Sequence, residues 1–203
     1  MNIGYATWGI GYNTAFREFA EEAASNAHAD LENPQRPKHR GADGEILTYT
    51  PHAVAAVWNS VLTLEAGIKE ISIWYQTGFM GQPILMPASF EKKSLAKKWA
   101  MLPQVIVGQS FDERSDLWKR FVTLIWIRNK ITHFQWRVDE VPEIMKELVA
   151  RDLVIPAAPG IYWFEAMLTN RVACWAVETI GLMFTEITKL LGQGEAPNWA
   201  WHD

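Results

Sequence analysis

The sequence contains very little cysteine: Cys174 is the only one among 203 residues. A single cysteine excludes an internal disulfide, so we expect the protein to work in a reducing compartment such as the cytoplasm. Cys174 lies in the apolar run VACWAV, residues 172–177, which has a helical pattern. We therefore expect its side chain to be buried as a small hydrophobic group.

The sequence also lacks the usual motifs for metal and nucleotide chemistry. It has no CxxC pair, no HExxH motif and no close cluster of histidines and carboxylates, and its five histidines are dispersed. We therefore expect no bound transition metal and no cofactor. A glycine-rich phosphate loop and a GxSxG motif are absent as well.

Long hydrophobic runs and an excess of positive charge are missing too. The apolar runs at 122–127 and 172–177 are too short to cross a bilayer, so we expect no membrane partner. The formal net charge of −4 argues against a broad phosphate-binding surface and leaves room only for a local basic site.

The sequence is rich in tryptophan, and its hydrophobic residues repeat with the period of an α-helix. We expect most of the 11 tryptophans in the core or at subunit contacts. The period predicts a first helix over 14–29, and the Pro/Gly/charge-rich segment 33–45 predicts a loop after it. Phe16, Phe19 and the alanines that follow would form the buried side of this helix.

Thr50 and Pro51 form a helix start signal, and the apolar pattern then predicts a helix to about Thr77, ended by Gly78. Glu65 is the one charged residue on the apolar face of this helix. A shorter helix over 90–102 carries four lysines, which form either a solvated face or a surface for RNA or a partner.

Ser110 and Glu113 have the spacing of a capping box and predict the start of another helix. A short helix over 142–150 and a long one over 163–191, ended by Gly192, complete the pattern. The predicted fold class is an all-α helical bundle with about three long helices and several short ones. We divide the chain into an N-terminal helical arm and loop (1–49), the bundle (50–192) and a tail (193–203).

The segment WIRNKITHF, residues 126–134, places three polar side chains suited to RNA chemistry near the end of a predicted helix. Cleavage of RNA without a metal needs a base for the 2′-OH, an acid for the leaving oxygen and a cation for the phosphorane. His133 can serve as base or acid, and Arg128 can bind phosphate with two parallel hydrogen bonds. Asn129 can orient either group.

The spacing constrains how these side chains can cooperate. Asn129 and His133 are four residues apart and share a helix face. Arg128 and His133 are five apart, which is about 140° on a regular helix. Either the helix end unwinds or a second copy completes the site across a two-fold axis, so a catalytic motif implies an oligomer.

IRNKITHF resembles the signature of the HEPN (higher eukaryotes and prokaryotes nucleotide-binding) family, R-x4-6-H with a polar residue after the arginine. The upstream segment VLTLEAGIKEI (61–71) is similar to a helix of many prokaryotic HEPN-like proteins, and SLAKKWAML (94–102) falls in the expected order. The resemblance covers roughly residues 50–192.

This resemblance implies a homodimer that pairs along the motif helix and acts as a metal-independent endoribonuclease on RNA. Such proteins occur in toxin–antitoxin and phage-defence systems, so an antitoxin protein is an expected partner. Carried over by position, Arg128 and His133 would be catalytic, with Asn129 and Glu65 supporting them. The basic residues expected to bind the RNA phosphates are Lys119, Arg120, Lys130 and Arg137.

Two other hypotheses stay open. Some HEPN domains are not nucleases, so the protein can instead be a non-catalytic dimerisation or binding module in which Arg128 and His133 are interface contacts. A small-molecule site between helices is the third hypothesis, and it rests only on the aromatic residues Trp74, Trp126, Trp136 and Trp163.

Overall fold

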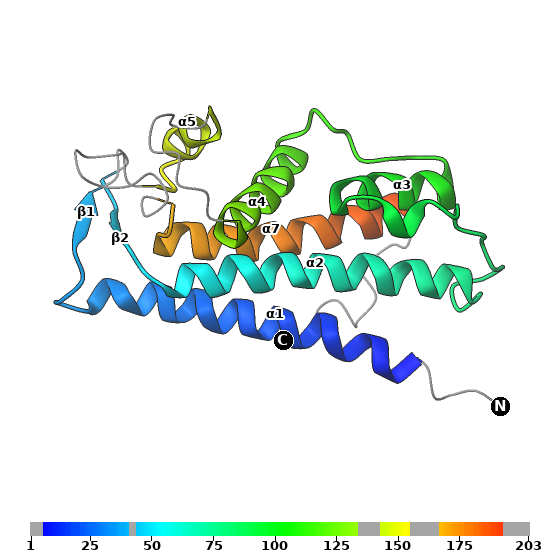
Figure 1. The fold of residues 1–203 in the computed structure, drawn as a ribbon, viewed down its shortest axis with the longest axis horizontal. Coiled ribbons are helices and arrows are strands. Elements are labelled where there is room, and N and C mark those ends of the chain that lie inside the picture. Colours follow the sequence, from blue (N-terminus) through cyan, green and yellow to red (C-terminus); the bar gives the residue numbers. More distant parts are fainter. Residues whose placement is uncertain (1–5, 41–43, 134–142, 155–166, 193–203) are drawn as a thin grey trace. The chain divides into compact units, whose positions relative to one another are not determined.

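The computed structural model describes residues 6–40, 44–133, 143–154 and 167–192 of the chain (Figure 1). Within these residues the protein is mostly helical, with a single two-stranded sheet, which confirms the all-α class. The elements are α1 (Ala6–Ala29), β1 (Lys38–Arg40), β2 (Ile46–Thr48), α2 (His52–Gln76), α3 (Leu95–Val107), α4 (Asp116–Thr132), α5 (Glu143–Ala150) and α7 (Asn170–Leu190). Two short 3-10 helices lie at Asp30–Glu32 and Phe90–Lys92.

The chain divides into two compact units, each assembled from separate stretches of sequence. Unit 1 consists of Met1–Phe16, Leu62–Val122 and Thr179–Asp203. Unit 2 consists of Arg17–Val61 and Thr123–Glu178. Helices α1, α2, α4 and α7 each contribute one part to unit 1 and the other part to unit 2.

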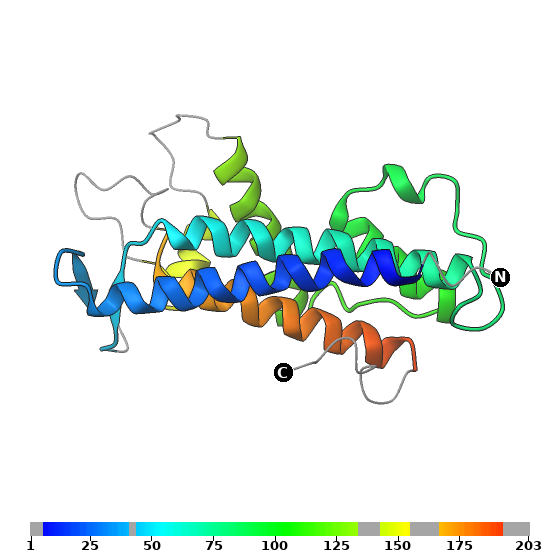
Figure 2. The same ribbon diagram turned by 90° about the horizontal axis from the view of Figure 1, so that it is seen from below.

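The core of unit 2 is built from small side chains. Alanines of α1 and α2 pack there with Leu168, which precedes α7, and with Ala173 in its first turn; the cluster is Ala23, Ala24, Ala27, Ala53, Ala56, Leu168 and Ala173. Because the distance between packed helices depends on the side chains at their contact, alanines allow these helices to approach closely. The unit 2 parts of α1 and α2 accordingly run side by side (Figure 1, Figure 2).

A short β-hairpin in unit 2 corrects the loop predicted over 33–45. Strands β1 and β2 pair antiparallel, with His39 opposite Leu47, next to the C-terminal end of α1 (Figure 2). Each strand has three residues, which is too short for an alternating pattern to be recognised in the sequence. The Thr48 N–H donates to Oδ1 of the buried Asn170 at 2.9 Å and ties the hairpin to α7.

The core of unit 1 is aromatic. The buried Trp99 of α3 meets the rings of Phe111, Phe121 and Phe184 edge-on, with centroids 5.5–6.0 Å apart. Its indole N–H donates to the backbone carbonyl of Leu64 at 3.2 Å, so the ring is buried with its polar atom satisfied. These contacts confirm that several tryptophans and phenylalanines form the core.

The predicted ends of α2 are confirmed. The Thr50 hydroxyl accepts the N–H of His52 at 3.2 Å, and Pro51 directly precedes the helix. The helix ends at Gln76, and Gly78 follows with a φ of 74°, a left-handed conformation that suits glycine. Gly192, with a φ of 68°, likewise follows the last helix.

Several helix starts were predicted wrongly. Helix α1 begins at Ala6 and not at 14, and α3 begins at Leu95 and not at 90, after the 3-10 helix Phe90–Lys92. The Ser115 hydroxyl, rather than that of Ser110, caps α4 by accepting the N–H of Trp118 at 3.1 Å, whereas the Ser110 hydroxyl donates to the carbonyl of Ala100. Helix α7 begins at Asn170 and not at 163, because Thr169 is occupied by a β-bridge to Tyr49.

Parts of the predicted buried faces are also wrong. Phe19 is 55% exposed on α1 and Val122 is 41% exposed on α4, although Ala20, Ala23, Phe121 and other neighbours are buried as expected. In both helices, small or aromatic residues one turn away occupy the face that packs against the core. Phe19 and Val122 lie outside that face and stay exposed to solvent.

Candidate functional site

The predicted catalytic residues lie at the C-terminal end of α4, in unit 2. Helix α4 is regular through Thr132, whose hydroxyl donates to the carbonyl of Arg128 at 2.8 Å. The backbone N–H of His133 donates to the carbonyl of Asn129 at 2.9 Å, so His133 still follows the hydrogen-bonding pattern of the helix. The helix therefore stays wound through the motif.

The motif side chains differ in exposure. Asn129 and His133 are both exposed, whereas Arg128 is half-buried and its Nε atom is buried. On a helix that stays wound, the Arg128 and His133 side chains leave the axis about 140° apart. A single copy of this helix therefore presents Asn129 and His133 together and directs Arg128 to another side.

The described basic residues expected to bind phosphate belong to different units. Lys130 lies near the motif, with its ammonium 5.5 Å from the centre of the Trp126 ring, a distance typical of cation–π contacts. Lys119 is exposed on α4 in unit 1, and Arg120 of the same unit donates through Nε to the Thr179 hydroxyl at 3.4 Å. Arg137 lies outside the described residues.

Glu65, the predicted helper, is half-buried on α2 and belongs to unit 1, whereas the motif belongs to unit 2. Its supporting role stays a prediction. A more deeply buried carboxyl in the same helix is Glu70, which sequence analysis missed. Glu70 lies three residues after Gly67 and four residues before Trp74, and both of these are buried. This helical spacing is the signal that could have predicted a buried carboxyl at position 70.

Burial changes the chemistry of Glu70. Desolvation raises the pKa of its carboxyl to about 7, and hydrogen bonding to the backbone of Asn13 lowers it in part. Its Oε1 atom is buried and has no hydrogen-bond partner among the described residues. A carboxyl in these surroundings can hold its proton near neutral pH.

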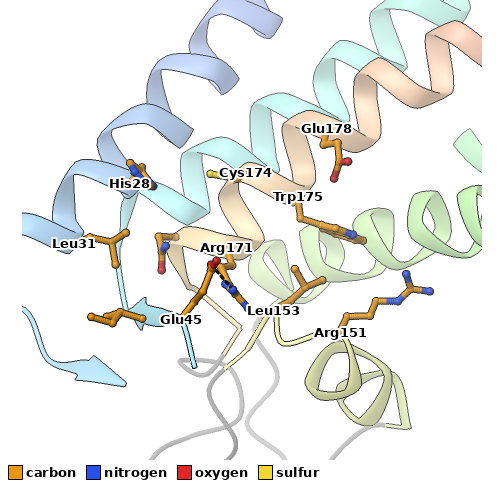
Figure 3. A pocket seen from close by; sticks show the side chains of 11 residues that line it. His28, Leu31, Glu45, Arg151, Leu153, Arg171, Cys174, Trp175 and Glu178 are labelled. Atoms are coloured by element: carbon orange, nitrogen blue, oxygen red, sulfur yellow. Dashed lines mark hydrogen bonds and ion pairs between the residues drawn. The ribbon is translucent and has the colours of Figure 1, made fainter. Parts of the chain in front are cut away.

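Unit 2 also contains a pocket of roughly 600 Å³ (Figure 3). Its walls come from the end of α1, the segment before β2, the residues after α5 and the first turns of α7. The lining residues are His28, Leu31, Glu45, Ile46, Arg151, Leu153, Asn170, Arg171, Cys174, Trp175 and Glu178. The predicted aromatic pocket is not this one, because neither Trp74 nor Trp126 lines it.

The sequence does not reveal this pocket, because its lining residues come from segments that are far apart in the chain. With the start at 163, Arg171 would fall in the middle of a helix, whereas it lies in the first turn of α7 and faces the hairpin segment. Leu153 and Glu45, which are far from Arg171 in sequence, then complete the same wall.

Cys174 corrects another prediction: it is exposed and lines the pocket. The inward stripe of α7 passes through Ala173, Ala176 and Ile180, which leaves Cys174 and Glu178 on the outer side of the helix. Desolvation by the neighbouring atoms nevertheless raises the pKa of the Cys174 thiol. The thiol therefore stays protonated at neutral pH.

Among the described residues, no group of three or more histidines, cysteines or carboxylates is placed to hold a metal ion. None of the described helices combines the length and the hydropathy that a membrane span requires. No family model matches the sequence, and it has no significant match among curated proteins or solved structures.

Proposed function

We propose that this protein is a metal-independent endoribonuclease of the HEPN type that acts as a homodimer, with Arg128 and His133 as catalytic residues. One observation carries the proposal: Asn129 and His133 are exposed together at the end of a helix that stays wound through the motif. The setting we propose is a toxin–antitoxin or phage-defence system, with an antitoxin protein as regulator.

The proposed chemistry uses only side chains of the motif. His133 takes the proton of a ribose 2′-OH, whose oxygen attacks the adjacent phosphorus, and the bond to the 5′-oxygen breaks. The His133 imidazolium formed in this step then donates the proton that the leaving 5′-oxygen needs. The products are a 2′,3′-cyclic phosphate and a 5′-hydroxyl end.

Arg128 has a separate role in this mechanism. Its guanidinium stays charged and can form two parallel hydrogen bonds with the phosphorane oxygens, which carry most of the developing negative charge. Asn129 lies on the same helix face as His133, so its amide can orient the imidazole or the phosphate.

The homodimer follows from the helix geometry. Because Arg128 and His133 diverge by about 140° on one helix, an active site needs His133 of one copy near Arg128 of the other. A two-fold axis near the end of α4 would bring two arginines and two histidines into one cleft, as two sites that each pair Arg128 of one copy with His133 of the other.

The burial of Arg128 favours a second candidate function, a non-catalytic dimerisation or binding module. Its side chain is half-buried within its own chain and its Nε atom is inaccessible, as for an arginine that holds helices together. In that case the accessible part of Arg128 and His133 are polar contacts at a dimer or partner interface, and neither residue takes part in catalysis.

Incubation of the purified protein with mixed RNA in EDTA tests the proposal. We compare the parent with His133→Ala and with a matched control, His28→Ala, which removes another exposed histidine of unit 2. We expect cyclic phosphate ends from the parent and the control, and a rate at least about 100-fold lower for His133→Ala.

Two results would reject the ribonuclease. Cleavage that survives His133→Ala removes this histidine from the mechanism. A parent that cuts no RNA, while it still self-associates and loses self-association in Arg128→Ala, identifies the binding module instead.

A further inference from the structure

Arg171 is held in a fixed position at the wall of the unit 2 pocket (Figure 3). Its Nη1 atom donates to the backbone carbonyl of Asp152 at 2.8 Å, and its Nη2 atom lies 2.6 Å from Oε2 of Glu45. The Arg171 side chain is only 18% exposed, whereas that of Glu45 is 75% exposed. A largely buried cation is therefore paired with a carboxylate that reaches it from the solvent.

The exposed partner can be replaced at low cost. An ion pair with one exposed member contributes little to stability, because water solvates the free carboxylate nearly as well. The Asp152 carbonyl keeps the guanidinium in place when Glu45 leaves. Another anion that enters the pocket would find Arg171 already oriented, and a planar guanidinium binds a carboxylate or phosphate with two hydrogen bonds.

The rest of the wall suits an organic molecule. Leu153 and Trp175 are buried side chains of the lining, and Leu31 and Ile46 add further apolar surface. The buried Asn170 accepts the N–H of Thr48, which fixes the hairpin side of the pocket. The volume of roughly 600 Å³ lies in the range of small-molecule sites.

We propose that this pocket binds a small organic anion, whose carboxylate or phosphate group takes the place of Glu45 on Arg171 while its apolar body contacts Leu153 and Trp175. The ligand class follows from the fixed guanidinium of Arg171 beside the apolar side chains of the lining. Arg151 also lines the pocket and adds positive charge, whereas Glu178 adds a negative charge. The proposal concerns residues outside the α4 motif and does not depend on ribonuclease activity.

Cys174 provides a direct readout of pocket occupancy. It lines the pocket, it is exposed, and it is the only cysteine of the chain, so alkylation by iodoacetamide reports on this site alone. We measure the alkylation rate by mass spectrometry with phenylacetate, phenyl phosphate, the uncharged phenylacetamide, inorganic phosphate, or sodium chloride at the same ionic strength.

The proposal predicts saturable protection by one or both organic anions. Half-maximal protection is expected in roughly the millimolar range, because a ligand of so few atoms gains limited binding energy. The organic anion that protects at the lower concentration identifies the preferred head group, carboxylate or phosphate. The neutral amide, inorganic phosphate and chloride should protect much less.

Two substitutions are expected to act in opposite directions. Glu45→Gln removes the competing carboxylate and should lower the half-protecting concentration about two- to fivefold. Arg171→Gln removes the cation and should raise it roughly tenfold or more. The matched control is Glu91→Gln, which removes the same charge from an exposed ion pair with Lys98 in unit 1 and should change nothing.

Several outcomes would overturn the proposal. If phenylacetamide protects Cys174 as well as phenylacetate does, Arg171 has no role in binding. If inorganic phosphate protects as well as the organic anions do, the apolar wall has no role in binding. Because the Glu45 side chain is well exposed, the Glu45→Gln variant should fold even if the Arg171→Gln variant does not. If no anion protects Cys174 in either the parent or Glu45→Gln, the pocket does not bind this class of ligand.

Discussion

Gly67 of α2 lies where the core of unit 1 leaves no room for a side chain. A Cβ atom at this position would clash with Cζ of Phe184 and lie 2.6 Å from its Cε1. The Phe184 ring is buried against Trp99, so any movement away from a new Cβ atom would disturb the packing of the core. Although alanine favours helix over glycine, we expect Gly67→Ala to lower the free energy of unfolding by about 1–3 kcal/mol, measured by urea denaturation.

A second substitution separates this clash from other effects. Phe184→Leu removes the ring, so Gly67→Ala should cost clearly less stability in that background than in the parent. Additive costs of the two changes would show that the ring is not the reason why glycine occupies this position.

At the same scale, Glu70 should make stability depend on pH. Its pKa is raised from 4.5 to about 7 by burial, so the native state holds a proton that the unfolded state releases. The contribution of Glu70 to stability is therefore highest below pH 4.5 and falls as the pH rises toward 7. Glu70→Gln resembles the protonated carboxyl and should stabilise the protein at pH 8 by at most about 3 kcal/mol, with little effect near pH 4.5.

Urea denaturation of the parent and the variant at both pH values checks this prediction. Glu22→Gln, which removes an exposed carboxylate of α1, is the control and should give the same small difference at each pH. A Glu70→Gln effect that does not change with pH would mean that burial does not raise the pKa of this carboxyl in the native protein.

At the scale of elements, the start of α4 allows a direct comparison of two serines. The Ser115 hydroxyl accepts the N–H of Trp118 in the first turn, so Ser115→Ala should cost about 1 kcal/mol of unfolding free energy. The Ser110 hydroxyl makes only an exposed bond to the carbonyl of Ala100, and Ser110→Ala should stay within about 0.5 kcal/mol. Equal costs in urea denaturation would contradict the assignment of the cap.

Helices were the part of this fold that the sequence could reveal. The signals at Thr50, Gly78 and Gly192 gave both ends of α2 and the C-terminal end of α7 nearly as observed, because these signals act within a few residues. The helical period alone placed the starts of α1 and α7 several residues away from the observed ones. The hairpin and the start of α7 depend on partners far apart in sequence, such as Thr48 with Asn170. Patterns of neighbouring residues in the sequence cannot predict pairs of residues that are so far apart in the chain.

The same limit applies to the candidate sites. The spacing of Arg128, Asn129 and His133 could be read because all three lie on one helix. The pocket joins α1, the hairpin, the segment after α5 and α7, and the pair of Arg171 with Glu45 spans 126 positions. Only the folded chain shows that these residues form one wall.

At the scale of the whole molecule, the proposed homodimer predicts that two inactive variants restore each other. If each active site combines Arg128 of one copy with His133 of the other, Arg128→Ala and His133→Ala should each be inactive alone. Half of the dimers formed after mixing and refolding equal amounts are mixed, and each has one intact site. We therefore expect about a quarter of the parent ribonuclease activity.

The control is a mixture of His133→Ala with His133→Ala,Arg128→Ala, which contains no intact site and should stay inactive. Size-exclusion chromatography with light scattering confirms that mixed and unmixed samples have the same mass. If the parent cuts RNA but mixing restores nothing, both residues act within one copy and the two-fold arrangement is wrong.

The division into two discontinuous units has a consequence for how the protein is made on the ribosome. Unit 2 needs residues up to Glu178 and unit 1 needs the following turns of α7, so both depend on the last described helix. The N-terminal half of the chain emerges first, with the alanine face of α1 and α2 still lacking its α7 contact. Neither unit can therefore complete its folding during synthesis until α7 has left the ribosome, and a chaperone that covers this face would act before that moment.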